Sequence, residues 1–478
     1  MKSRTFSEAE IESVVKKLDR SEARIPNPEI AARSPVHVVY GGANLFTAET
    51  PAKLGKLALK AIDTYAPDFA EFARAMWLAG ADTLPLDEDA VRELEFQLIE
   101  NEGKTKSENF AAWLAWTVYN RTIEKLKNEP VEDFRIDFED GYGFRPDEEE
   151  DAHAVAASDE LARSFSEKTV TPFCGFRIKS LQPETRRRAV RTLDLFLTNL
   201  LEKTGGKLPA NFVVNLPKII RADEVAALAE LLDKFESKNG LDSGAIKIEI
   251  MIETPQAILG EKGEIALRSL VEAGGGRVVS AHFGAYDYTA SFGISGMHQH
   301  LNHDACNFAR QMMQTALSPL NIRLSDSVTI EMPVPVHRGE NLTEKQIMEN
   351  KAAVQRAWRK HFNNVTTSLI NGFYQSWDLH PAQLAARYAA VYAFFLESKD
   401  VQARRLKNFV EKATRASLTG NTFDDAASAN GLLNFFLTAL NCGALREDEI
   451  MRETGFTPEE LRVGSFAKIM ERKEKISL

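Results

Sequence analysis

IKIEIMIETPQAI, residues 246–258, is the stretch of sequence from which the fold can be worked out. Its first seven residues, Ile246–Ile252, are mostly branched or long apolar residues, which is typical of a buried strand. Glu249 and Glu253 are four residues apart, so both lie on one face of that strand. Glu253 falls at the carboxyl end of the strand, where a parallel barrel carries its chemistry.

Seven other segments have the same buried-strand character. They are Val36–Tyr40, Phe134–Phe138, Phe173–Ile178, Phe212–Leu216, Val278–Phe283, Val328–Met332 and Phe373–Leu379. Amphipathic helical stretches separate most of them, and alternating strands and helices indicate parallel strands joined by crossover helices. No G-x-G-x-x-G motif follows an early strand, which argues against an open nucleotide-binding sheet. The sequence therefore predicts an α/β fold, a (β/α)₈ TIM barrel.

Two long blocks do not fit the strand–helix repeat. Residues from about 65 to 130 carry apolar residues at helical spacing with no strand among them, and the chain beyond about residue 398 is again helical throughout. We expect a helical insertion after the first strand and a helical C-terminal extension. The expected division is an N-terminal helical segment 1–35, a barrel domain 36–398 that contains the insertion at about 65–130, and an extension 399–478.

The composition limits the classes of function. The chain has 478 residues with 59 Lys+Arg and 69 Asp+Glu, a net charge of −10, which argues against nucleic acid as a partner. No apolar run approaches the ~18 residues that a membrane helix needs. The three cysteines, Cys174, Cys306 and Cys442, are too few and too far apart for a disulfide framework or a structural zinc site. We expect a cytoplasmic globular protein.

Acidic residues and one arginine lie at the ends of the second and third predicted strands. RIDFEDGYG places Asp137, Glu139 and Asp140 within four residues, with Asp137 and Glu139 on the same side of the strand. Arg177 lies between apolar neighbours in GFRIKS, so its buried guanidinium needs an anion. That anion is either a structural carboxylate, Asp137 or Glu139, or a carboxylate or enolate of a substrate.

A second acidic pair follows the fifth and sixth strands. Glu253 ends one strand, and Asp287 comes just after Gly284 at the end of the next. Two carboxylates with water and two substrate oxygens suit octahedral Mg²⁺; the alternative is two solvated loop acids. Lys218, which follows the fourth strand in NLPKI, is interpreted as a surface residue.

One histidine-rich stretch imitates a metal motif. HQHLNH at 298–303 nearly matches the H-x-H-x-D-H pattern of metallo-β-lactamase-like hydrolases, but Asn302 stands where the aspartate belongs. The surrounding order of strands and helices also differs from that sandwich fold. A polar loop before a helix at Asp304 is the favoured interpretation. Since no G-x-S-x-G, P-loop or paired cysteine motif is present, serine-nucleophile, NTPase and thiol chemistries have little support.

Taken in order, six stretches resemble the citrate lyase β-subunit and HpcH/HpaI aldolase group of the phosphoenolpyruvate/pyruvate-binding barrel superfamily. They are VYGGANLFTAETPAKLGKLA (39–58), DFEDGYG (137–143), GFRIKS (175–180), IETPQAI (252–258), FGAYDYTASFGI (283–294) and GFYQSWDLHPAQL (372–384). The DFED stretch is also similar to a motif of malate synthases. The match extends from about residue 36 to 396, so it covers the whole predicted barrel.

The resemblance implies a Mg²⁺-dependent carbon–carbon lyase or aldolase. Glu253 and Asp287 would then hold the metal, and Arg177 would bind the substrate and stabilise its enolate. Glu139 and Asp137 would assist by orienting Arg177 or a water. The substrate would be a 2-oxo acid, a hydroxy acid or an acyl-coenzyme A thioester, and the protein would be a homo-oligomer.

Two further residues belong to the expected site, and one pair of residues departs from the family pattern. Asp140 and Gly284 are expected to contact the substrate. Gln375–Ser376 replace a common Gly-Lys pair, which leaves the use of coenzyme A open, and Asp378 is the one candidate for a general base. The alternatives are a malate-synthase-like condensing enzyme and a barrel that binds a ligand without catalysis.

Overall fold

The computed structural model describes residues 33–415 and 426–463, together with a few single positions nearer the two ends. Eight parallel strands form a closed barrel in chain order, with β8 pairing back to β1, so the predicted TIM barrel is confirmed. The strands are β1 (His37–Gly42), β2 (Asp133–Asp137), β3 (Phe173–Arg177), β4 (Phe212–Leu216), β5 (Lys247–Ile252), β6 (Val278–Phe283), β7 (Arg323–Val328) and β8 (Gln375–Asp378).

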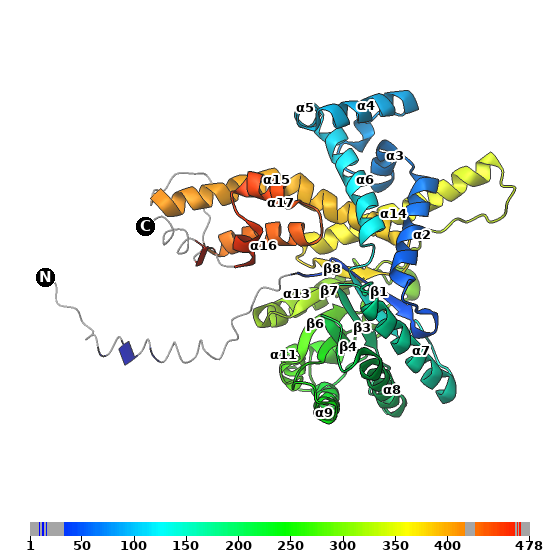
Figure 1. The fold of residues 1–478 in the computed structure, drawn as a ribbon, viewed down its shortest axis with the longest axis vertical. Helices are drawn as coiled ribbons and strands as arrows, with labels where there is room; N and C mark the ends of the chain where they lie inside the picture. The colour runs from blue at the N-terminus through cyan, green and yellow to red at the C-terminus, as the bar shows by residue number, and fades with distance from the viewer. Residues whose placement is uncertain are drawn as a thin grey trace.

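Helices surround the barrel and connect its strands, as Figure 1 shows. The long ones are α2 (Thr50–Tyr65), α7 (Asp147–Ser166), α8 (Arg186–Thr204), α9 (Ala222–Asn239), α11 (Ala266–Ala273), α13 (Asp304–Leu317), α14 (Glu344–Ile370) and α15 (Gln383–Arg415). Two short helices, α10 (Pro255–Ile258) and α12 (Ala285–Ala290), follow β5 and β6 directly. No helix in the described ranges is long and apolar enough to span a membrane.

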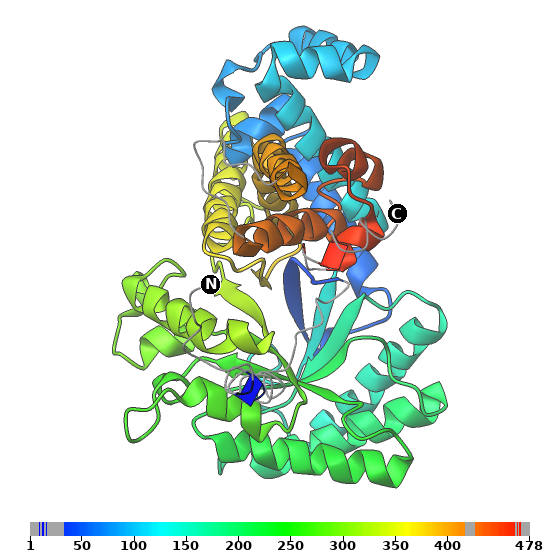
Figure 2. The same ribbon diagram turned by 90° about the vertical axis from the view of Figure 1, so that its left-hand side faces the viewer.

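The helical insertion and the C-terminal extension lie together on one side of the barrel (Figure 2). The insertion contains α3 (Phe69–Met76), α4 (Glu88–Glu100), α5 (Glu102–Glu108) and α6 (Phe110–Asn128), and the extension contains α16 (Ala426–Asn441), α17 (Glu447–Thr454) and α18 (Pro458–Arg462). Helix α6 packs on α15. Arg121 of α6 donates to the Ala444 carbonyl oxygen and, at 2.7 Å, to Glu449. The two additions therefore form one helical body.

Two of the predicted domain boundaries, after residue 35 and after residue 398, can be compared with the structure. Helix α15 continues through the predicted boundary at 398/399, so the last helix of the barrel is also the first helix of the extension. The predicted N-terminal segment 1–35 lies almost entirely outside the described residues. The division into domains stays a prediction.

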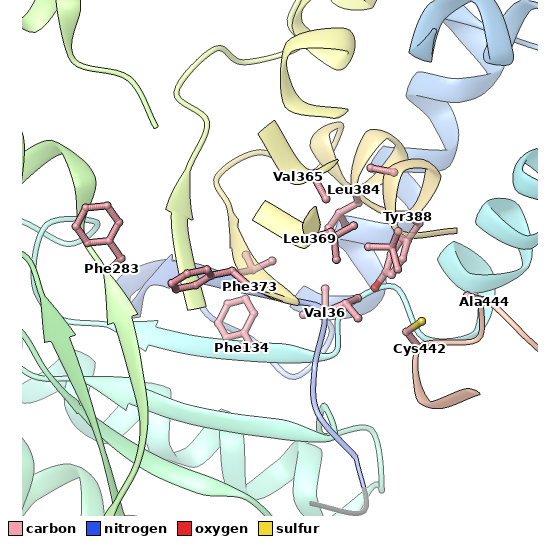
Figure 3. Packing of buried hydrophobic residues seen from close by; sticks show 14 of the residues in the cluster. Val36, Phe134, Phe283, Val365, Leu369, Phe373, Leu384, Tyr388, Cys442 and Ala444 are labelled. Carbon is pink, nitrogen blue, oxygen red and sulfur yellow. The ribbon is translucent and has the colours of Figure 1, made fainter. Parts of the chain in front are cut away.

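A continuous apolar core joins the helical body to the barrel. Figure 3 labels Val36, just before β1, Tyr388 of α15, and Cys442 and Ala444 of the extension, which all belong to one apolar cluster. None of these four residues is exposed. Because burial of apolar surface is the main stabilising term in folding, this contact fixes the helical body on the barrel rather than leaving it tethered.

The seventh strand was predicted at the wrong place. It is Arg323–Val328, not Val328–Met332, and Ile330 and Met332 lie in the following loop with 46% of each exposed. Arg323 and Ser325 are polar, so the true strand has no apolar run to find. The prediction failed because the search for apolar runs assumes an apolar barrel interior.

The interior of this barrel is instead partly charged. Glu249 is fully buried and accepts two hydrogen bonds of 2.9 Å from Arg135. Asn215 and Ser280 also donate to it, at 2.9 and 2.6 Å. Burial alone would raise the pKa of Glu249, but Arg135 and His282 outweigh it and hold that pKa well below its usual value. These paired charges and their hydrogen bonds form a polar layer beneath the carboxyl ends of the strands.

Candidate functional site

The predicted site residues all lie at the carboxyl ends of the barrel strands. Asp137 ends β2 and Arg177 ends β3. Glu253 follows β5 directly, and Asp287 lies in the first turn of α12, just after β6. Closing the sheet into a barrel brings these ends to a common rim.

Arg177 is held in one orientation by Asp137. Its Nε donates to Asp137 Oδ1 at 2.7 Å and its Nη2 donates to Oδ2 at 2.6 Å, a planar two-point pairing. Asp137 also accepts hydrogen bonds from the backbone N–H groups of Glu139, at 2.9 Å, and Gly141, at 2.7 Å. Asp137 has no free lone pair directed at a ligand in this arrangement, so the geometry gives it the role of positioning Arg177.

One nitrogen of Arg177 remains free of Asp137. Its Nη1 lies 3.4 Å from Glu139 Oε2. The guanidinium lies over the rings of Tyr40 and Trp377, 4.9 and 5.5 Å from their centroids. Burial lowers the pKa of Arg177, but Asp137 and Glu139 outweigh this effect, so the group stays charged. Arg177 is thus a rigid buried cation at the rim of the barrel.

Glu253 points into the site and is 2% exposed. Its Oε1 accepts a hydrogen bond of 2.5 Å from the backbone N–H of Lys218. Burial and the nearby negative charge of Asp287 raise the pKa of Glu253 to about 8. A bound cation would offset both effects on Glu253, because it stabilises the ionised carboxylate. Asp287 is 46% exposed, so the pair has one buried and one accessible member.

Gly284 lies against Glu253. A Cβ atom added at Gly284 would lie 2.5 Å from the Glu253 Cβ and 2.6 Å from its Oε2. Only glycine leaves room for the Glu253 carboxylate here. The structure therefore gives Gly284 a packing role, and its predicted contact with substrate stays a prediction.

Lys218 is the site residue that the sequence interpretation missed. Its Nζ lies 2.7 Å from Glu139 Oε1 and 2.9 Å from Asp140 Oδ1. It also lies 3.7 Å from Asp287 Oδ2, and its side chain is 32% exposed. Burial lowers the pKa of Lys218, but the bonds to Glu139 and Asp140 raise it above its usual value. The interpretation as a solvated surface lysine is wrong. Its position directly after a strand of the barrel was the signal.

A second lysine fixes the loop that follows β2. The Nζ of Lys179 donates to the carbonyl oxygens of Phe138 and Gly143, at 2.6 and 3.2 Å, and lies 3.1 Å from Glu150 Oε2. This loop carries Glu139 and Asp140. Lys179 is 5% exposed, so it stabilises this loop as a buried cation.

Asp378 cannot serve as the general base. It is fully buried and is held by Arg387 through bonds of 2.8 to 3.1 Å. His37 and His361 each contact it at 2.8 Å. Asp378 thus sits in a closed network beside α14 and α15, on the side of β8 opposite to Trp377. The suggestion that it acts as a base is wrong because alternate residues of a strand face opposite sides.

The residues at the rim fit a magnesium ion in their donor chemistry. In the described part of the chain, no three histidine, cysteine or acidic residues are gathered closely enough to enclose a metal, and this holds for the HQHLNH loop as well. Magnesium does not need such an enclosure, because one or two carboxylates with water and substrate oxygens suffice. Glu253 and Asp287 supply hard oxygen donors, and a bound cation would offset the burial and the negative charge of Asp287 that raise the pKa of Glu253.

Fold and rim together define a (β/α)₈ barrel with an acidic, arginine-containing centre. Solved structures with the same fold include a citrate lyase from Burkholderia xenovorans LB400, at 18% identity and a TM-score of 0.50, covering 70% of this chain and 91% of that one. The citrate lyase beta subunit from M. tuberculosis, complexed with oxaloacetate and magnesium, is more distant, at 17% identity and a TM-score of 0.35, covering 57% and 92%. A malate synthase of Haloferax volcanii, in a magnesium/glyoxylate complex, has 14% identity and a TM-score of 0.41, covering 68% and 92%. Likeness at this level concerns the fold alone.

No curated protein matches the sequence. The chain belongs to the family described as a domain of unknown function, DUF6986, whose profile matches residues 15–469. The match covers the barrel, the insertion and most of the extension, so these parts recur together in one family.

Proposed function

We propose that this protein is a Mg²⁺-dependent carbon–carbon lyase or aldolase of the citrate lyase β-subunit and HpcH/HpaI type. The observation that carries the proposal is the pairing of a buried carboxylate, Glu253, with Asp287 on the next strand end, beside a fixed arginine. Glu253 and Asp287 would hold the metal. The substrate is a small 2-oxo or hydroxy acid, free or as a coenzyme A thioester.

Each residue contributes a defined step. The bound ion would supply the charge that polarises the substrate carbonyl and stabilises the developing enolate. Arg177 offers the Nη1 that Asp137 leaves free to a substrate carboxylate or to the enolate oxygen. Because Arg177 is already oriented by two bonds to Asp137, little reorganisation is needed when charge develops.

The bond changes in the cleavage direction balance within the substrate. The carbon–carbon bond between the carbon next to the carbonyl group and the carbinol carbon breaks, and its electron pair stays with the carbonyl fragment as an enolate. The hydroxyl proton passes to Glu139, so the carbinol carbon becomes a carbonyl. Glu139 then returns the proton to the enolate carbon. Burial and Asp140 raise the pKa of Glu139, which suits a carboxylate that must accept a proton.

Exchange of the methyl protons of pyruvate in D₂O tests the proposal without knowledge of the aldehyde partner. We expect Mg²⁺-dependent loss of the pyruvate methyl signal in ¹H NMR spectra, abolished by EDTA and by Glu253→Gln. Glu261→Gln, which changes an exposed loop glutamate, is the matched control and should exchange at the wild-type rate.

Two other outcomes separate the alternatives. If the acetyl protons of acetyl-coenzyme A exchange, glyoxylate is consumed and the pyruvate protons do not exchange, the protein is a malate-synthase-like condensing enzyme and not a lyase. Binding of Mg²⁺ and oxalate with no exchange in either substrate would overturn catalysis in favour of a ligand-binding barrel. The predicted cytoplasmic location, homo-oligomeric state and lack of a nucleic-acid partner stay predictions.

A further inference from the structure

Lys218 contacts both carboxylates of the candidate metal site, Glu253 and Asp287, and two acidic residues beside it. Its ammonium group lies 2.7 Å from Glu139 and 2.9 Å from Asp140. The same group lies 3.7 Å from Asp287 Oδ2. Its backbone N–H donates to Glu253 at 2.5 Å. One residue therefore organises four acidic side chains that come from three different strand ends.

The backbone at Lys218 is adapted to this double contact. Its φ is +51°, a left-handed conformation that residues other than glycine seldom adopt. Such a conformation persists where the surroundings require it, often at functional sites. At Lys218 it accompanies a backbone N–H bonded to Glu253 and a side chain that reaches Glu139.

The charges at the rim are unequal. Arg177 is matched by Asp137 and also reaches Glu139, whereas the Lys218 ammonium is shared by Glu139, Asp140 and Asp287. A divalent ion bound to Asp287 would lie within a few ångströms of the ammonium. Like charges at such a separation repel strongly in a site of low dielectric constant. The divalent ion and the Lys218 ammonium group therefore compete for the same carboxylate oxygens.

We propose that Lys218 is a positioning residue that makes divalent-cation binding depend on the substrate. In the free protein its ammonium holds the carboxylates in place and weakens binding of Mg²⁺. An anionic 2-oxo acid brings the negative charge that lets ammonium and metal coexist, so ion and substrate bind cooperatively. By linkage, each then tightens the other by the same factor. This inference rests on the proposed function, because it takes the acidic cluster as the magnesium site.

Calorimetric titration of the metal-free protein with Mg²⁺, without and with oxalate, tests the inference. Lys218→Met removes the charge at similar size, and Lys218→Arg keeps it. We expect Lys218→Met to bind Mg²⁺ alone at least tenfold more tightly than wild type, about 1.4 kcal/mol. Oxalate should tighten Mg²⁺ binding less in Lys218→Met than in wild type. Lys218→Arg should keep the wild-type dependence on oxalate.

Loss of a positive charge elsewhere on the protein serves as the control. Lys234→Met removes one positive charge from the surface of α9, where Lys234 pairs with Glu230, and should leave Mg²⁺ affinity unchanged. Thermal unfolding first establishes that Lys218→Met is folded, and Glu253→Gln establishes that wild type binds Mg²⁺ through Glu253. If Lys218→Met then binds Mg²⁺ no more tightly than wild type, the inference about Lys218 is wrong and the proposed function still stands. If neither protein binds Mg²⁺ with or without oxalate, the proposed function fails as well.

Discussion

Substituting alanine for Gly284 tests the Glu253 carboxylate without removing it. The added Cβ would lie 2.5 Å from the Glu253 Cβ and 2.6 Å from Oε2. Ordinary contact between such atoms needs about 3.5 Å, so the Glu253 side chain must move by close to 1 Å. Magnesium demands oxygen ligands at about 2.0–2.1 Å in near-ideal geometry, so a shift of that size removes Glu253 from the ion.

The expected loss of Mg²⁺ affinity in Gly284→Ala is about 10–100-fold, or ~1.4–2.7 kcal/mol. Overpacking should also lower the free energy of unfolding by about 1–3 kcal/mol, which leaves a chain of this size folded. Calorimetry with Mg²⁺ and oxalate measures the affinity, and circular dichroism checks the fold. Gly296→Ala is the control, because nothing lies within 4 Å of its added Cβ. Wild-type affinity in Gly284→Ala would refute the assignment of Glu253 as a ligand.

Three other predictions follow from the same contacts. Arg177→Lys should slow Mg²⁺-dependent proton exchange of pyruvate by about 100-fold or more, since a lysine cannot make the two-point pairing with Asp137 and also donate to substrate; an unchanged rate would contradict its role. Binding of Mg²⁺ should release a proton at pH 6.5 and almost none at pH 9, since the pKa of Glu253 without metal is about 8. Calorimetric titration in buffers of different ionisation enthalpy measures the number of protons released. A number that does not change with pH would count against Glu253 as a metal ligand. Asp378→Asn should lower the free energy of unfolding at pH 7 by about 3–5 kcal/mol, measured in urea, because a buried arginine loses its partner. Since the pKa of Asp378 is held far below its usual value despite burial, its contribution is present above pH ~4 and is lost as the pH falls further, so the two proteins should converge in acid.

Much of the barrel could be predicted from the sequence because most of its strands are apolar. β4 and β6 have the predicted bounds, Phe212–Leu216 and Val278–Phe283. The strand β7 could not be found in this way, because Arg323 and Ser325 belong to a polar interior layer. Only the closed barrel brings such residues together with Asp133 and Glu249.

The site shows the same limit. Residues that follow apolar strands, Asp137, Arg177 and Glu253, could be proposed from position alone, because the carboxyl ends of parallel strands meet at one rim. The contacts of Lys218 could not be predicted from the sequence, since its carboxylate partners come from the loop after β2 and from α12. The prediction of Asp378 as a general base was wrong for a different reason. Neighbouring residues of a strand face opposite sides, so a shift of one residue reverses the direction of a side chain.

Anomalous diffraction from a crystal soaked with Mn²⁺ and oxalate shows whether Glu253 and Asp287 hold the metal. Manganese prefers the same oxygen ligands as magnesium and scatters anomalously. We expect one strong peak bonded to carboxylate oxygens of Glu253 and Asp287, with oxalate between the ion and Arg177. A peak at another set of residues, or none at the rim with oxalate bound, would contradict it.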